Sequence, residues 1–243
     1  MNEVKKKCLG WRKILTFAKY GLFYFLMFCS FLVNAQSSTS SEKESTQGLT
    51  YYSGSIYHAK KANADIDGTV YVSEGWKKGS VINALGNETP VDQLQYDVYN
   101  QKILFVLGGQ IYSLNEDLNI KEFRLGHKVF EKRFISGENK PDFFEVLSDN
   151  SKIGLLKRYK CTLVKGKAST GALPGRNDMF VMDTELYVEK EGGALEKIKP
   201  NKGNVLDLMD DKSDKIVEFA KSNKLNYRKE QDLTRILNFY DSL

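Results

Sequence analysis

The fold is decided by three runs, Leu94-Gln-Tyr-Asp-Val-Tyr99, Lys102-Ile-Leu-Phe-Val-Leu107 and Gln110-Ile-Tyr-Ser-Leu114, which are separated by Asn100-Gln101 and Gly108-Gly109. In the first run apolar and polar side chains alternate, as expected for a strand with one buried face. Glycine at both central positions of a two-residue loop is typical of a tight β-hairpin. The three runs therefore predict consecutive antiparallel strands.

The same pattern continues on both sides, over residues 69–198. Turn residues recur at close to the 8–12-residue spacing of β-sandwiches and barrels. Residues 143–147 and 153–164 predict a longer hairpin, and residues 180–188 turn at Gly192-Gly193 into a last strand. We predict a mainly β (α+β) fold: an antiparallel β-meander, a sandwich or a partly closed barrel.

Beyond Lys202 the spacing of apolar residues becomes helical. Residues 204–209 predict one or two turns, and Ser213 is a suitable cap for a helix over residues 214–222 that ends at Asn223. In residues 229–241 the apolar side chains lie at i, i+3, i+4 and i+7. Short amphipathic helices cannot bury their apolar stripes alone. We therefore expect two to three short C-terminal helices packed on the sheet.

The N-terminus predicts export. Residues 1–35 combine a basic start, an apolar run over residues 20–33 and small residues before Gln36, which together are typical of a signal peptide cleaved between Ala35 and Gln36. A retained anchor is the alternative, but the apolar run is shorter than the roughly 18–20 residues of a spanning helix. Lipidation of Cys29 is disfavoured by the bulky Phe28 before it. The expected location is periplasmic or secreted.

The expected organisation follows from this leader. Residues 36–48 have no apolar side chain to bury and predict a flexible polar tether. An antiparallel β domain then occupies residues 49–200, and residues 201–243 form a helical segment packed on the same domain. Removal of the leader takes away Cys8 and Cys29, which leaves Cys161 alone and allows no internal disulfide. Cys161 shares a strand face with apolar residues and is expected to be a small buried side chain.

The charge balance also changes when the leader is removed. The whole chain holds 36 basic and 31 acidic residues. The leader contains six of the basic residues and one acid, so the remainder is formally neutral. Neutrality argues against a nucleic-acid partner, which requires a basic face. The basic runs at residues 157–160 and 165–167 are interpreted as a solvated strand face.

The sequence contains no recognisable catalytic motif. It has no Gly-x-Ser-x-Gly, no His-Glu-x-x-His and no Walker loop. His58 and His127 each stand without a neighbouring acid or cysteine motif, and the acidic cluster at residues 207–214 lacks the spacing of a calcium loop. We therefore expect a protein that is not an enzyme and has neither cofactor nor metal.

Two groups of residues are candidates for contact with a ligand or partner. The first is an aromatic cluster near a polar segment, Tyr51, Tyr52, Tyr57 and Trp76. Aromatic side chains in such a setting bind sugars or peptides, although packing along an edge strand is the simpler explanation. The second group comprises Tyr96, Asp97 and Asn100. Here we favour a structural role, with Tyr96 in the core, Asp97 on the outer face and Asn100 in the turn.

Several runs resemble a group of exported Bacteroidetes proteins. They are Gly68-Thr-Val-Tyr-Val72, Pro90-Val-Asp-Gln-Leu-Gln-Tyr-Asp-Val-Tyr-Asn100, Phe143-Phe-Glu-Val-Leu147, Leu155-Leu-Lys-Arg-Tyr159 and the ending Leu237-Asn-Phe-Tyr-Asp-Ser-Leu243. Ala35-Gln36 also resembles the export junctions common in that phylum. The resemblance spans residues 66–243 and implies architecture and export. The group has no established activity, so the resemblance implies no mechanism.

The function expected from these observations is that of an exported, non-catalytic β-rich protein of the cell envelope or extracellular space that acts through a protein partner. The first alternative is a barrel-like carrier of a small apolar ligand or lipid. The second is a hydrolase with an unrecognised carboxylate pair. We expect the membrane to be contacted only by the leader, during export.

Overall fold

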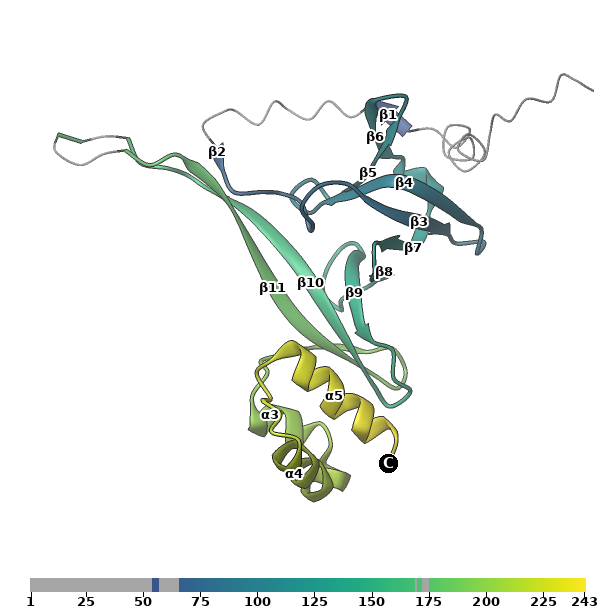
Figure 1. Cartoon of the computed structure of the whole chain (residues 1–243), viewed down its shortest axis with the longest axis vertical. Helices are drawn as coiled ribbons and strands as arrows, with labels where there is room; N and C mark the ends of the chain where they lie inside the picture. Colours follow the sequence, from purple (N-terminus) through teal and green to yellow (C-terminus); the bar gives the residue numbers. More distant parts are fainter. Residues whose placement is uncertain (1–53, 57–65, 169, 172–174) are drawn as a thin grey trace, which may run out of the picture. The chain divides into compact units, whose positions relative to one another are not determined.

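The computed structural model describes residues 54–56, 66–168, 170–171 and 175–243 (Figure 1). The predicted leader and tether therefore lie outside the described residues. The strands are β1 (Gly54–Ile56), β2 (Ile66–Asp67), β3 (Lys77–Asn83), β4 (Glu88–Asp97), β5 (Lys102–Leu107), β6 (Gln110–Leu114), β7 (Ile120–Leu125), β8 (Lys128–Arg133), β9 (Asp142–Ser148), β10 (Ile153–Val164), β11 (Asp178–Lys190) and β12 (Leu195–Ile198).

All of them belong to one 12-stranded sheet, in the order β1-β6-β5-β4-β3-β7-β8-β9-β10-β11-β12, with β2 beside β11. Neighbouring strands are antiparallel except β2 and β11, which are parallel. The sheet is not closed, because β1 and β12 form its two edges. The prediction of a mainly β fold with C-terminal helices is confirmed.

The predicted glycine hairpin is present between β5 and β6. Leu107 pairs with Gln110, and Gly108 and Gly109 have φ angles of 58° and 79°. Positive φ at both central positions is the type I′ turn, whose twist matches that of the strands it joins. A side chain at either position would be strained, which explains the glycine pair.

The sheet curls because β6 must reach β7. In hydrogen-bonding order β5, β4 and β3 lie between these two strands, a distance of about 19 Å across a flat sheet. Only residues 115–119 connect them, and Glu116–Leu118 form a turn of 3₁₀ helix within that connection. The sheet therefore bends until β4–β6 face β7–β9.

The main core lies inside this curl. Its centre is aromatic: the rings of Phe123 and Phe130 stack at 4.6 Å, and Tyr96 lies 5.2 Å from Phe123. All three side chains are at most 2% exposed. Tyr159 and Cys161 of β10 close this core from the opposite side. The expected placement of Tyr96 in the core is confirmed.

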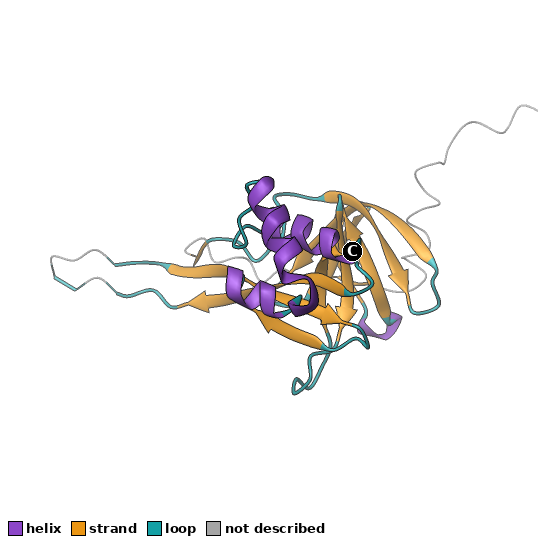
Figure 2. Cartoon of the chain, turned by 90° about the horizontal axis from the view of Figure 1, so that it is seen from below, coloured by secondary structure: helices purple, strands orange, loops and turns teal. Residues whose placement is uncertain are grey.

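Three α-helices follow the sheet: α3 (Lys202–Asp207), α4 (Ser213–Ser222) and α5 (Glu230–Asp241). They lie together at one end of the β10–β11 hairpin (Figures 1 and 2). Ile216, Leu233 and Ile236 form a second core with Leu155 and Val188 of the hairpin. A further small cluster, Phe144, Leu156 and Tyr187, lies on the other face of the hairpin.

One predicted cap is wrong. The cap position of α4 is Lys212, whose side chain makes no capping hydrogen bond, and Ser213 is already helical. The reason is that the 3₁₀ turn Asp210–Lys212 leads directly into α4. The predicted stop is confirmed, since Asn223 is the C-terminal cap and its Nδ2 donates to the Phe219 carbonyl at 2.9 Å.

Candidate functional site

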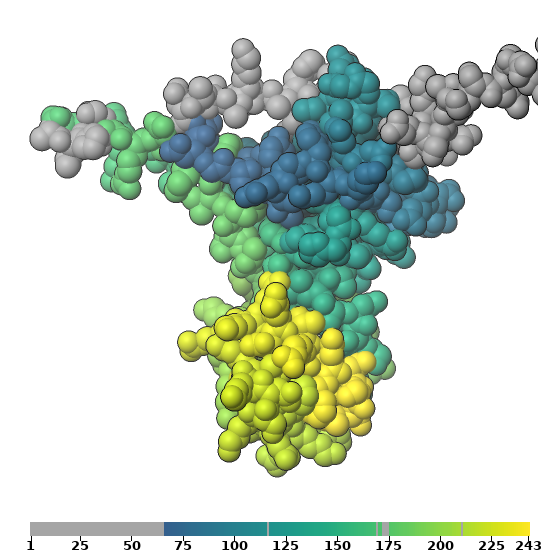
Figure 3. Space-filling model, viewed as in Figure 1, coloured from purple at the N-terminus to yellow at the C-terminus, as the bar shows by residue number. Residues whose placement is uncertain are grey.

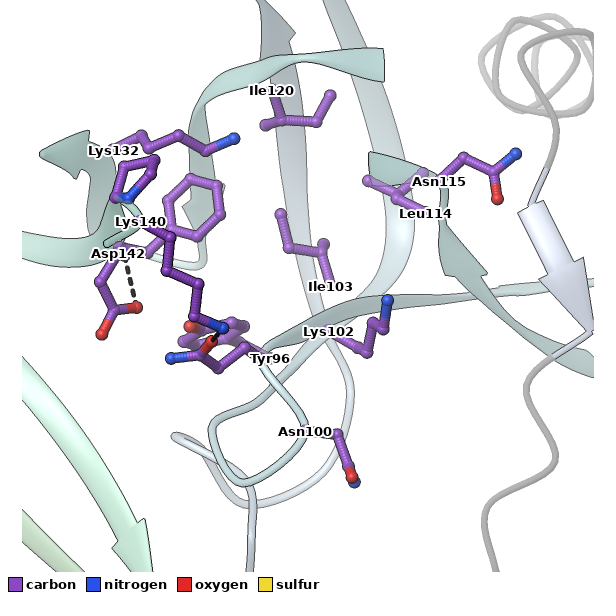
Figure 4. A pocket seen from close by; sticks show the side chains of 13 residues that line it. Tyr96, Asn100, Lys102, Ile103, Leu114, Asn115, Ile120, Lys132, Lys140 and Asp142 are labelled. Atoms are coloured by element: carbon purple, nitrogen blue, oxygen red, sulfur yellow. Dashed lines mark hydrogen bonds between the residues drawn. The ribbon is translucent and has the colours of Figure 1, made fainter. Parts of the chain in front are cut away.

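A pocket of about 250 Å³ lies where the two halves of the curled sheet meet (Figure 4). Its walls come from six strands, β4 to β9, and from the β4–β5, β6–β7 and β8–β9 connections. The lining residues are Tyr96, Asn100, Gln101, Lys102, Ile103, Leu114, Asn115, Ile120, Lys132, Lys140, Pro141, Asp142 and Phe143. The curl creates this pocket, because it brings β4–β6 opposite β7–β9.

The floor of the pocket is apolar. Ile103, Leu114 and Ile120 come from β5, β6 and β7 and are each at most 7% exposed. Phe143 of β9 and the ring of Tyr96 complete it. Burial raises the pKa of Tyr96, and the negative charges of Asp142 and Asp97 raise it further. The phenol is therefore neutral at physiological pH, and the floor itself carries no charge.

Three lysines surround this floor. Lys102 begins β5, Lys132 lies in β8, and Lys140 belongs to the connection before β9. The Lys132 ammonium lies 5.2 Å from the centroid of the Phe143 ring, which places the charge directly over the apolar surface. Lys140 donates a hydrogen bond to Oε1 of Gln101, so its side chain reaches across the pocket to the β4–β5 turn (Figure 4).

Asp142 is the single carboxylate among the lining residues, and its charge is already balanced. Its Oδ2 accepts from Nε of Arg158 at 2.8 Å, and its Oδ1 accepts from the backbone N–H of Phe143. Arg158 in turn makes two hydrogen bonds to Glu138, of 2.6 and 2.8 Å. The pocket lining therefore holds three ammonium groups and one carboxylate, and that carboxylate is paired with Arg158.

Neutral polar groups form the rim nearest the β4–β5 turn. The backbone N–H and Nδ2 of Asn100 both donate to the Asp97 carboxylate, at 2.9 and 2.8 Å. Asn100 therefore stabilises the turn, as expected. Asp97, expected on the outer face, is 1% exposed, so the strand face opposite Tyr96 is buried as well. Burial is tolerated because this carboxylate receives the hydrogen bonds of the turn.

Of the aromatic cluster expected from the sequence, the structure describes Trp76. Trp76 is half-buried immediately before β3 and is not a lining residue. Tyr51, Tyr52 and Tyr57 lie outside the described residues, as does His58. His127 is exposed in the β7–β8 turn. Cys161 is half-buried, and burial followed by the charge of Asp97 raises its pKa, which is the opposite of an activated thiol.

Sequence reasoning missed all three pocket lysines. They lie far apart along the chain, in segments where lysine is common, and no local spacing relates them. The sequence does place Lys102 and Lys140 near the starts of predicted strands. Lysine is common at such positions, so this placement does not indicate a binding site. The convergence depends on the curl of the sheet.

The described residues offer no group of three or more His, Cys, Asp or Glu side chains able to hold a metal ion. Among the helices that the structure describes, none has the length and apolar character needed to cross a bilayer. Comparison of the chain with protein-family models, with curated proteins and with solved structures gave no match.

Proposed function

We propose that this protein is an exported, non-catalytic binding protein whose pocket holds a small organic anion with an apolar body. The observation that carries the proposal is the convergence of Lys102, Lys132 and Lys140 over an apolar floor whose one carboxylate is paired with Arg158. This arrangement develops the expectation of a carrier for a small apolar ligand. The proposal adds a negatively charged group to the apolar ligand expected from the sequence.

The size and chemistry of the pocket define the ligand class. A volume of about 250 Å³ lies just below the roughly 300–1,000 Å³ of typical ligand pockets, so the ligand is small. The apolar part of the ligand packs on Ile103, Leu114 and Phe143. A carboxylate or phosphate then lies within reach of the ammonium groups, where hydrogen bonds to charged donors are the strong ones.

Three probes with the same apolar body test the proposal: benzoate, benzyl alcohol and benzylamine. Saturation-transfer NMR on the full chain reports which of them binds. We expect benzoate to bind more tightly than benzyl alcohol, and benzylamine to bind least. Equal signals from all three probes would contradict a positively charged site.

Substitution locates the binding. We expect Lys132→Met and Lys140→Met each to weaken benzoate binding about fivefold, which corresponds to roughly 1 kcal/mol for a partly exposed charge contact. Benzyl alcohol binding should change little, because the methionine stem retains the apolar contact. Lys121→Met is the matched control, since Lys121 is an exposed β7 residue outside the pocket. If the control weakens benzoate equally, the pocket is not the site.

Action through an envelope protein partner, the other function expected from the sequence, stays a prediction. The described contacts do not test it. Recovery of a specific partner from envelope extracts by the full chain, and not by an unrelated exported protein, would support it.

A further inference from the structure

We propose that the far end of the β10–β11 hairpin binds an anionic membrane surface. We call the described residues of this part, 159–168 and 175–184, the arm. The proposal is independent of the pocket, because none of the pocket's lining residues belongs to the arm. The sequence predicts membrane contact only through the leader, so the arm supplies a second contact.

The arm is a two-stranded ribbon. The pairing of β10 with β9 ends at Arg158, and that of β11 with β12 begins at Leu186. Between these points β10 and β11 pair with each other out to Val164 and Met179, and only the short β2 joins them, at residues 178–179. The arm extends beyond the curled part of the sheet (Figures 1 and 3).

The two faces of the arm differ in what covers them. On the inner face, Cys161 and Met182 pack on the main core, and the Phe180 ring lies 5.0 Å from that of Tyr99. On the outer face, Val164 and Met179 are directly opposite each other and are 49% and 44% exposed. An apolar pair at a projecting end, rather than in a hollow, suits insertion into a boundary region more than capture of a ligand.

Two cations follow this apolar pair further along the hairpin. Beyond Val164 and Met179, Lys167 and Arg176 pair directly across the hairpin, with backbone hydrogen bonds of 3.0 and 2.9 Å between them. Both side chains are exposed. Like charges directly opposite each other destabilise a hairpin, and a negatively charged partner relieves that repulsion.

Two acids lie near the apolar pair: Asp67 of β2, which pairs with Met179, and Asp178. Asp178 accepts hydrogen bonds from the Lys165 ammonium at 2.7 Å and from the Gly166 N–H at 2.9 Å. The Asp178 carboxylate therefore pairs with Lys165 and stabilises the turn through Gly166. Among the described residues, no salt bridge engages Lys167 or Arg176, and residues 168–175 between them contain no acid.

A bilayer rich in anionic lipid fits both features at once. Its headgroups are complementary to Lys167 and Arg176, and its headgroup–acyl boundary accepts exposed side chains such as Val164 and Met179. An acidic protein segment would match the charge alone. The membrane surface is therefore the favoured partner.

Tryptophan placed on the arm tests the proposal in the full chain. Met179→Trp reports burial of the arm by a blue shift of its emission when vesicles are added. The matched control is Leu85→Trp, because Leu85 in the β3–β4 turn is 85% exposed and distant from the arm in sequence. Subtracting the control also removes the response of the native tryptophans, Trp11 included.

We expect Met179→Trp to shift with vesicles of phosphatidylglycerol and phosphatidylcholine, and not with phosphatidylcholine alone. The shift should disappear in 0.5 M salt, because the attraction is screened. In the same background, Lys167→Glu with Arg176→Glu should lower the vesicle partition coefficient at least about tenfold. The charge control, Lys121→Glu with Arg228→Glu, changes two exposed residues outside the arm and should lower it much less.

Three results would overturn the proposal: no shift of Met179→Trp, an equal shift with neutral vesicles, or an equal shift of Leu85→Trp. A shift with polyglutamate but not with vesicles would also overturn it and assign the arm to an acidic protein partner. Circular dichroism verifies that the charge variants are folded. We expect them to fold, because the Lys167 and Arg176 side chains are exposed.

Discussion

At the scale of single residues, Lys157 and Arg158 of β10 lie on opposite faces of the strand, and both are buried, at 8% and 7% exposure. The Lys157 ammonium lies 3.1 Å from Oε2 of Glu145 and 2.8 Å from Oε1 of Glu230. Arg158 binds Asp142 on the other face. The expectation of a solvated strand face is therefore wrong for these two residues, because neighbouring elements supply a carboxylate for each.

Glu185 gives a prediction at this scale. Burial raises its pKa, but hydrogen bonds from Lys197, Lys160 and Tyr187 outweigh burial and lower the pKa to about 2. A lowered acid pKa adds stability above its unfolded value, near 4.5, and that stability is lost as the pH falls through about 2.

We therefore expect Glu185→Gln to lower the free energy of unfolding at pH 7 and to flatten its decline between pH 5 and pH 2.5. Urea unfolding at several pH values measures both effects. Glu196→Gln is the control, because Glu196 is 58% exposed in its pair with Lys190 and such pairs contribute little. Unchanged pH dependence in Glu185→Gln would show that the pKa is not lowered.

At the scale of elements, the β10–β11 hairpin lies in three different environments along its length. Near Ile153 and Leu155 it packs on α4 and α5. Around Tyr159 and Cys161 it closes the main core, and beyond Val164 it is the exposed end of the arm. The sequence predicted these strands and their shared apolar face. It did not predict the three environments, since each is made by a segment distant in sequence.

Helix α5 gives a prediction at this scale. Ile236 is fully buried between the helices and the hairpin, so Ile236→Ala leaves a cavity there. We expect it to lower the free energy of unfolding by about 2–5 kcal/mol. Arg235→Ala, at the exposed neighbouring position, should change it by less than about 0.5 kcal/mol.

Urea unfolding followed separately by strand and helix signals measures this effect. Because strand and helix residues share one core, we expect both signals to be lost in a single transition. Early loss of the helix signal in the wild type would show instead that the helices unfold independently of the sheet.

At the scale of the whole molecule, the predicted leader gives an expectation about export. We expect the exported protein to begin at Gln36, cyclised to pyroglutamate. N-terminal mass spectrometry of protein recovered from the cells checks this cleavage. An intact Met1 would contradict it and favour the retained anchor.

Local sequence is enough to predict the strands, their tight turns and the helical ending, because these depend on local periodicity and on glycine at positive φ. It also indicated the neutral charge of the chain beyond the leader. Only the tertiary structure decided where charges converge: Lys102, Lys132 and Lys140 meet because a short β6–β7 connection forces the sheet to curl. Lys167 and Arg176 oppose each other because the register of β10 and β11 aligns them. Contacts between distant segments leave no local pattern, so no reading along the chain reveals them.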